Sequence, residues 1–171
     1  RFRVSAIKRA SVLADETDYV LVLDKEADLA GLPDSLRSGA AAAAEQRGHK
    51  GKWAILNTRS SMEPFLTYSD RRDLREKVWR TYFSRGDNGD ANDTKAIITA
   101  IVRLRAERAR LLGFKSHAHW RMQDTMAVDP AVAQSFLLKV WPFVVARVRD
   151  EVADMQTLAS REQPGITIEP W

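Results

Sequence analysis

The sequence contains no cysteine in its 171 residues, and it lacks the long apolar segments that mark membrane proteins. Without cysteine these residues offer no disulfide bond, no thiolate metal ligand and no cysteine nucleophile. No unbroken apolar run approaches the roughly 18 residues of a membrane-spanning helix, and the N-terminal segment lacks the apolar centre of a signal peptide. We therefore expect no membrane partner and a cytoplasmic protein, with the periplasm as the alternative.

Familiar catalytic motifs are also missing. The sequence has no H-E-x-x-H metallopeptidase motif, no G-x-S-x-G nucleophile motif and no glycine-rich phosphate-binding loop. His117 and His119 lie two residues apart, and such side chains point to different faces of a helix, so they make a poor metal pair. His49 lies in a glycine-flanked turn and is expected to be exposed. The sequence therefore nominates no catalytic residue and no metal ligand, and it leaves the substrate-binding residues unknown.

Composition and charge describe an ordinary folded domain. Apolar residues make up 44% of the chain and charged residues 29%, which is typical of globular proteins rather than disordered ones. The 27 basic and 23 acidic side chains are interspersed, and the net charge is only +4, so we expect no nucleic-acid partner. The length suits one domain. We predict that residues 1–171 form a single helical domain.

The stretch that organises the chain runs from Asn92 to Ala127. Its pattern predicts a long amphipathic helix capped by Asn92 or Asp93, a stop at Leu-Leu-Gly-Phe (residues 111–114), and a short second helix capped by Ser116. A helix over 70–85 precedes it. Another begins after Asp129-Pro130, and Pro142 should kink or divide it near residue 138.

The N-terminal part predicts a small β element among further helices. Apolar, β-rich runs at 19–23 and 52–57 are strand candidates that could pair, and 64–67 is a third short extended candidate. A helix over 1–14 should be broken by the acidic residues 15–18, and a second helix should cover 34–47 through five consecutive alanines. The predicted fold class is therefore mainly α, with a two- or three-stranded β element.

Two features of the sequence invite functional interpretations. A helical wheel at about 100° per residue places Arg105 and Arg108 within the apolar arc of the central helix. Because an unpaired buried charge is very costly, either an acidic residue elsewhere pairs with them or this face meets substrate or another part of the protein. The loop Asp87–Asp93 has closely spaced carboxylates around a glycine, but its spacing does not match a calcium-binding loop and no glutamate closes it. We therefore interpret it as a polar helix–helix connection.

Several separated motifs, in the right order, resemble the thimet-oligopeptidase family of zinc metallopeptidases, and most closely its bacterial peptidyl-dipeptidases. The resemblance covers nearly the whole chain but only a middle portion of the family's longer protein. The motifs are Leu29-Ala-Gly-Leu-Pro33, Lys52-Trp53, Arg72-x-x-Arg75-Glu76, Asn92-Asp-Thr-Lys-Ala-Ile97, the segment 105–114 (RAERARLLGF), Asp124-x-Met126-Ala127 and Glu169-Pro170-Trp171.

This resemblance implies a zinc enzyme that removes dipeptides from the C-termini of short peptides inside a channel between two helical lobes. The family binds zinc through H-E-x-x-H and a later glutamate, and none of these residues is present here. The resemblance therefore implies zinc in the parent protein but not in this piece, which would form one lobe and part of the channel wall. Its partners would be the missing catalytic lobe and, for the parent protein, short peptides.

Two alternatives stay open at this stage. Because the chain starts at Arg1 without a methionine and stops at Pro170-Trp171, we interpret it as a piece of a longer protein. Because the family's zinc-binding and catalytic residues are absent from it, we expect this piece to be inactive alone. A stand-alone helical interaction module is the first alternative, favoured if Arg105 and Arg108 dock an acidic partner. A nucleic-acid-binding helical domain is the second, and it rests only on the arginine-rich central helix.

Overall fold

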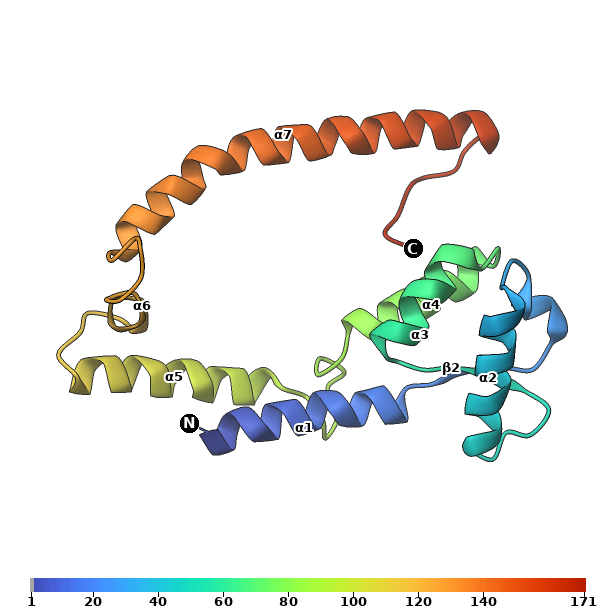
Figure 1. Ribbon diagram of the computed structural model, residues 1–171, viewed down its shortest axis with the longest axis horizontal. Coiled ribbons are helices and arrows are strands. Elements are labelled where there is room, and N and C mark those ends of the chain that lie inside the picture. The colour runs from blue at the N-terminus through green and yellow to red at the C-terminus, as the bar shows by residue number, and fades with distance from the viewer. Residues whose placement is uncertain (1) are drawn as a thin grey trace. The chain divides into compact units, whose positions relative to one another are not determined.

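A computed structural model describes the backbone of residues 2–171 and the side chains of residues 4–171. The predicted mainly helical fold with a small β element is confirmed (Figure 1). In chain order the elements are α1 (Phe2–Asp18), β1 (Leu21–Leu23), the 3-10 helix η1 (Glu26–Leu29), α2 (Asp34–Gln46), β2 (Trp53–Ile55), α3 (Arg59–Tyr68), α4 (Arg72–Phe83), α5 (Lys95–Leu111), α6 (His117–Arg121) and α7 (Pro130–Glu162).

The chain forms two compact units, residues 1–101 together with Trp171 and residues 102–170. The division falls within α5, which therefore contributes residues to both units. Whether 1–171 acts as one domain, as the sequence predicts, stays a prediction. Each unit is described separately below.

The first unit is built on a two-stranded antiparallel sheet backed by helices. β1 and β2 pair as predicted, with Leu21 opposite Ile55 and Leu23 opposite Trp53. An isolated pair of three-residue strands is marginal in water, so it needs an apolar backing. α2 lies against β2, and the alanines of its inner face, Ala40 and Ala44, allow a close approach. The alanine run is thus explained by packing.

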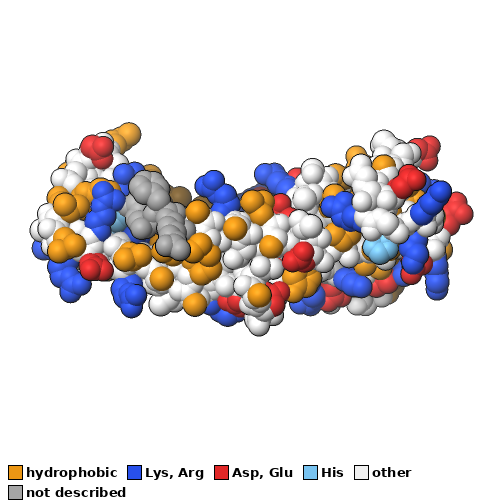
Figure 2. Space-filling model, turned by 90° about the horizontal axis from the view of Figure 1, so that it is seen from below, with side chains coloured by type: hydrophobic (Ala, Val, Ile, Leu, Met, Phe, Trp, Pro, Cys, Tyr) orange, Lys and Arg blue, Asp and Glu red, His pale blue; other side chains and the backbone are white. Residues whose placement is uncertain are grey.

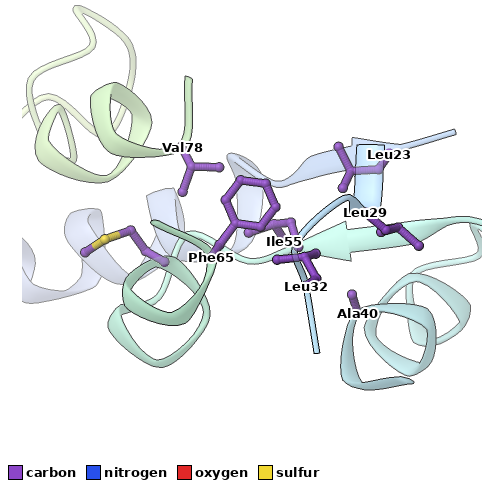
Figure 3. Close-up of a cluster of buried hydrophobic side chains, with 8 residues drawn as sticks. Leu23, Leu29, Leu32, Ala40, Ile55, Phe65 and Val78 are labelled. Carbon is purple, nitrogen blue, oxygen red and sulfur yellow. The ribbon is translucent and has the colours of Figure 1, made fainter. Parts of the chain in front are cut away.

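The core of this unit gathers around Phe65, whose side chain is only 1% exposed. Figure 3 shows the Phe65 ring between Val78 of α4 and the aliphatic side chains of Ile55 and Leu32. α3 and α4 also pack against each other. The buried cluster consists of Leu23, Leu29, Leu32, Ala40, Ile55, Met62, Phe65 and Val78.

Two sequence predictions in this unit are wrong. The segment 64–67 is not extended but lies within α3, because burying Met62 and Phe65 on one helical face outweighs the cost of about 3 kcal/mol that Pro64 imposes inside a helix. The acidic residues 15–18 do not end the first helix, which continues to Asp18. The contacts that keep them helical are described in the next subsection.

The second unit contains the end of α5, α6 and the long helix α7. α5 ends as predicted at Gly113, which has φ of +78°, while the Phe114 N–H donates to the Ala109 carbonyl at 2.8 Å. The caps of the next two helices are also confirmed, since Ser116 accepts from the N–H of His119 and Asp129 accepts from the N–H of Ala131.

α7 is one continuous 33-residue helix (Figure 1). Of the two predicted effects of Pro142, a kink or a division near residue 138, the division does not occur, and the kink stays a prediction. By length and composition alone, α7 could cross a membrane. The sequence of α7 is not an unbroken apolar run, because Lys139 interrupts its apolar segment. After α7, the chain is held alongside the helix by Gln156, whose side-chain amide donates to Ile166 O at 2.7 Å and accepts from Ile168 N at 2.8 Å.

Two glycines provide a matched test of the first unit. Gly31 has φ of +82°, and a Cβ there would lie 2.1 Å from the Tyr68 carbonyl oxygen, where the backbones of residues 30–31 and 68–70 approach closely. Gly39 lies within α2, and a Cβ there would meet nothing within 4 Å. We expect Gly31→Ala to lower the free energy of unfolding by more than about 2 kcal/mol.

Gly39→Ala should instead raise the free energy of unfolding by about 0.5–1 kcal/mol, because alanine loses less backbone entropy than glycine when a helix forms. Urea denaturation followed by circular dichroism measures both variants. Equal effects of the two substitutions would contradict the packing described here.

Candidate functional site

The histidines do not form a metal site. His119 Nδ1 lies 2.8 Å from the Ser116 hydroxyl, and the His117 ring packs on Trp120 with 5.5 Å between ring centroids. His49 is exposed, as predicted. Among residues 2–171 the structure brings together no group of three His, Asp or Glu side chains that could hold a metal ion. These residues therefore do not fit the zinc ion that the family resemblance implies, and no zinc chemistry is assigned to them.

The acidic loop Asp87–Asp93 uses its carboxylates for internal structure. Asp93 accepts from the backbone N–H of Lys95, the first residue of α5, at 2.8 Å, and from the N–H of Gly89 at 3.0 Å. The Lys95 ammonium pairs with Asp93 and Asp87. Asp93 thus acts at the start of α5 as predicted, and the ion pair with Lys95 lowers the pKa of its carboxyl group. The loop behaves as a polar helix connection.

The predicted pairing of Arg105 and Arg108 with an acidic residue is not found among the described residues, and the alternative, that this face meets substrate or another part of the protein, stays a prediction. Both side chains are exposed, and none of the ion pairs found among residues 4–171 includes them. Arg108 instead stacks on the Trp120 ring, with its guanidinium carbon 3.8 Å from the ring centroid. The apolar arc in which the wheel placed both arginines is mostly exposed, since Ala109 is the only buried residue among residues 102–112.

A buried polar junction, which sequence reasoning missed, lies where α1 meets the loop after α4. We call it the Asp15 junction, and it consists of Asp15, Asn57, Gly86 and Asn88. Asp15 is fully buried, and its Oδ2 accepts from the Gly86 N–H at 2.6 Å and from the Asn88 amide at 3.0 Å. The Asn57 amide donates to the Asp15 backbone carbonyl at 3.1 Å.

This junction explains why α1 continues through its acidic end. Carboxylates near a helix C-terminus are unfavourable, because they meet the negative end of the helix dipole. Here each acidic residue is engaged by the segment 85–92: Glu16 pairs with Arg85, and Asp18 accepts from Asn92. The buried oxygens Asp15 Oδ1 and Asn57 Oδ1 have no hydrogen-bond partner in the described part of the chain. The junction therefore depends on the few bonds that it does make.

A second feature is an aromatic surface on α4, which we define as Trp79, Phe83 and Trp171 with the Arg80 guanidinium. The Trp79 ring lies 4.7 Å from the Phe83 centroid and 5.4 Å from the Trp171 centroid, and Arg80 lies 4.7 Å from the Trp171 centroid. Phe83 is 62% exposed. This surface can stack against peptide or aromatic groups, but it contains no nucleophile paired with a base.

On the face drawn in Figure 2, basic and acidic side chains are interspersed, and apolar side chains lie exposed among them. A strongly basic stripe, which nucleic-acid-binding proteins present, is not seen on that face.

Comparison with known proteins identifies relatives over most of the chain. A family model described as peptidase family M3 matches residues 65–171. The chain is 36% identical to dipeptidyl carboxypeptidase of Escherichia coli over 160 residues, which cover 94% of this chain and 24% of that protein. It is 31% identical to oligopeptidase A of Salmonella typhimurium over 165 residues, with 94% and 24% covered.

A plant relative extends the comparison. The chain is 39% identical to a probable cytosolic oligopeptidase A of Arabidopsis thaliana over 113 residues, which cover 63% of this chain and 16% of that protein. The chain thus spans about a quarter of the length of the two bacterial relatives.

The Asp15 junction makes a quantitative prediction. Replacing Asp15 with alanine would leave the buried Gly86 N–H and the Asn88 amide without their acceptor. We expect this loss to lower the free energy of unfolding by about 1–3 kcal/mol. Asp18→Ala is the matched control, because Asp18 is exposed and accepts only one long bond of 3.4 Å. Asp18→Ala should change the free energy of unfolding by no more than about 0.5 kcal/mol. Urea titration of both variants measures the difference, and similar values for the two would refute the assigned role.

Tyr19 gives a pH-dependent prediction. Its hydroxyl donates to Asp90 Oδ2 at 2.5 Å, and this hydrogen bond to a carboxylate is the main cause that raises the tyrosine pKa from 10.0 to about 12. Since the folded pKa is raised, the contribution of this bond to stability is fully present below pH 10 and is lost as the pH rises toward 12.

Absorbance titration of tyrosinate should therefore show one late-titrating group that disappears in Tyr19→Phe. Tyr68, whose hydroxyl makes no hydrogen bond to a carboxylate within the described residues, serves as the control through Tyr68→Phe. Loss of the late step in the Tyr68 variant instead would contradict the assignment.

Proposed function

Because this chain belongs to peptidase family M3, we propose that it is the non-catalytic helical part of a zinc-dependent oligopeptidase or peptidyl-dipeptidase. The enzyme would remove dipeptides from the C-termini of short peptides. The family resemblance that the separated sequence motifs indicated is confirmed by these matches. The catalytic role, the zinc and the peptide substrates are proposed for the longer protein.

The observation that carries this proposal is the coverage of the matches. The alignment with dipeptidyl carboxypeptidase uses 94% of this chain but only 24% of the relative, so about three quarters of such a protein lies outside residues 1–171. Within the described residues no group of side chains fits a metal ion. Zinc binding and peptide-bond hydrolysis are therefore proposed for the remaining part.

The structure suggests what this chain contributes to such an enzyme. The core around Phe65 and the Asp15 junction hold the first unit together, so that it could present the α4 aromatic surface on a fixed support. A peptide channel needs rigid walls, because ordering flexible walls when the peptide binds would weaken its binding. We propose that the chain forms part of that channel wall.

The exposed arginines of α5 favour a second candidate, a helical interaction module. Arg103, Arg105 and Arg110 are exposed and take part in no ion pair found among residues 4–171, so they could contact an acidic partner protein. Such binding would weaken as salt is raised. Binding to DNA or RNA with a steep salt dependence would instead support the nucleic-acid alternative.

A peptide-cleavage assay on the complete polypeptide tests the proposal. Incubated with a short N-terminally blocked peptide, it should release the C-terminal dipeptide, as detected by mass spectrometry. A zinc chelator should abolish the release and added zinc should restore it. The same peptide with a C-terminal amide should be cleaved much more slowly, because a peptidyl-dipeptidase recognises the free carboxylate.

Residues 1–171 alone should release no dipeptide. Chelator-sensitive cleavage by these residues would overturn the non-catalytic role. A complete polypeptide that cleaves none of the peptides would overturn the peptidase function and leave the interaction module as the better explanation.

A further inference from the structure

The apolar surface of α7 is unusually wide along its N-terminal half. Residues 131–145 read AVAQSFLLKVWPFVV, and the only polar side chains among them are Gln134, Ser135 and Lys139. At about 100° per residue, the large apolar side chains spread over roughly 240° of the helix circumference. The apolar stripe of an ordinary surface helix is nearer 100° wide. The exposed apolar side chains are Val132, Phe136, Leu137, Leu138, Val140, Trp141, Phe143 and Val144.

The C-terminal half of the same helix has a different pattern. In residues 146–162 the large apolar side chains Val148, Val152, Met155 and Leu158 form a stripe about 120° wide, and charged residues occupy much of the remaining surface. At the edge of the stripe, Arg147 pairs with Glu151 at 2.9 Å. This half has the pattern of a helix with one buried and one solvated face.

The structure leaves the wide apolar surface uncovered. No residue of α7 is buried, and Phe136 and Phe143 are 66% and 77% exposed. Two apolar pockets lie along this half, and Leu137 lines both of them. Phe136 lines one of the two, and Trp141 lines the other. An uncovered apolar surface of this extent marks an interaction site.

A lipid bilayer fits this surface poorly. The apolar segment 130–146 is about 25 Å long at 1.5 Å per residue, which is shorter than the roughly 30 Å of a hydrocarbon core. Lys139 lies near its centre, where a charge is most costly in a membrane. Arg147, Arg149 and Asp150 follow directly.

A second copy of the chain also fits poorly. A symmetric dimer covers the same patch on each partner and would bury one side of each helix. An apolar arc of roughly 240° needs neighbours on several sides. The matched relatives supply a source for such neighbours, because three quarters of their length lies outside the region that aligns with this chain.

We propose that residues 131–145 of α7 form an interior helix of the complete peptidase, enclosed by polypeptide of the same molecule that lies outside residues 1–171. Residues 146–162 then lie at the surface, with only their stripe covered. This inference rests on the proposed function, and it names the partner that the chain requires: the remaining part of its own enzyme, docked around Phe136, Trp141 and Val144.

Cysteine labelling of the complete polypeptide tests this enclosure, since residues 1–171 contain no cysteine of their own. Any cysteine elsewhere in the polypeptide would first be replaced, and single-cysteine variants Phe136→Cys and Asp150→Cys prepared. In the native protein, a maleimide should react with the cysteine at 136 more slowly than in urea by roughly 100-fold or more. The cysteine at 150, on the side of the helix opposite the stripe, should react at similar rates in both conditions.

A second variant and a cross-link identify what covers the helix. Val144→Cys changes the side-chain volume less than Phe136→Cys and should show the same protection if the latter variant does not fold. A photoreactive phenylalanine analogue at position 136 should cross-link to peptides from outside residues 1–171.

Each other outcome has a defined meaning. Fast native labelling at 136 and 144 in an active peptidase would overturn the enclosure and leave the proposed function intact. Protection that disappears on dilution would indicate a second copy, protection that depends on membranes would indicate a bilayer, and cross-links to residues 2–101 would indicate cover by this chain's first unit; each result overturns the proposal. Slow labelling with cross-links outside residues 1–171, in a protein without peptidase activity, would uphold the enclosure and reject the proposed function.

Discussion

The buried carboxyl group of Asp15 joins three segments of the first unit that lie far apart in the sequence. Asp15 is fully buried, and burying a polar group is costly unless it is hydrogen-bonded. Its donors come from Gly86 and Asn88, some 70 residues along the chain, and its own carbonyl accepts from Asn57. One residue thereby ties α1 to the segment after β2 and to the loop that leads into α5. These hydrogen bonds to Oδ2 and to the Asp15 carbonyl fix the three segments relative to one another.

The two units differ in how they treat apolar side chains. The first buries Leu23, Leu29, Leu32, Phe65 and Val78 in a core, whereas α7 exposes large apolar residues along most of its length. The first unit thus buries many of its large apolar side chains, and α7 buries none of its own. The proposed enclosure of α7 by polypeptide outside residues 1–171 would remove this difference.

Local sequence signals predicted the features that depend on neighbouring residues. The paired strands, the stop at Gly113 and the caps Ser116 and Asp129 follow from turn chemistry and apolar patterning, and the structure contains them. Predictions failed where contacts between residues far apart in the sequence determine the local structure. Asp15 looked like a helix breaker because Gly86 and Asn88, its partners, are far away in sequence.

The same reasoning explains the other errors. Pro64 looked unfit for a helix because the burial of Phe65 could not be read from its neighbours. The wheel placed Arg105 and Arg108 in an apolar arc, but a wheel says nothing about whether a second element covers that arc. The helix over 70–85 was predicted, but the contact of Trp171 with Trp79 on the α4 aromatic surface was not, because it joins residues far apart in the sequence.

The stacking of Trp171 on Trp79 has a spectroscopic consequence. Two indole rings whose centroids are 5.4 Å apart and whose planes are inclined by 55° couple their electronic transitions, and such coupling splits circular dichroism bands into a couplet of opposite signs. The Arg80 guanidinium beside Trp171 adds a local electric field that shifts the emission of that indole. The circular dichroism and fluorescence of these tryptophans therefore report whether Trp171 contacts α4.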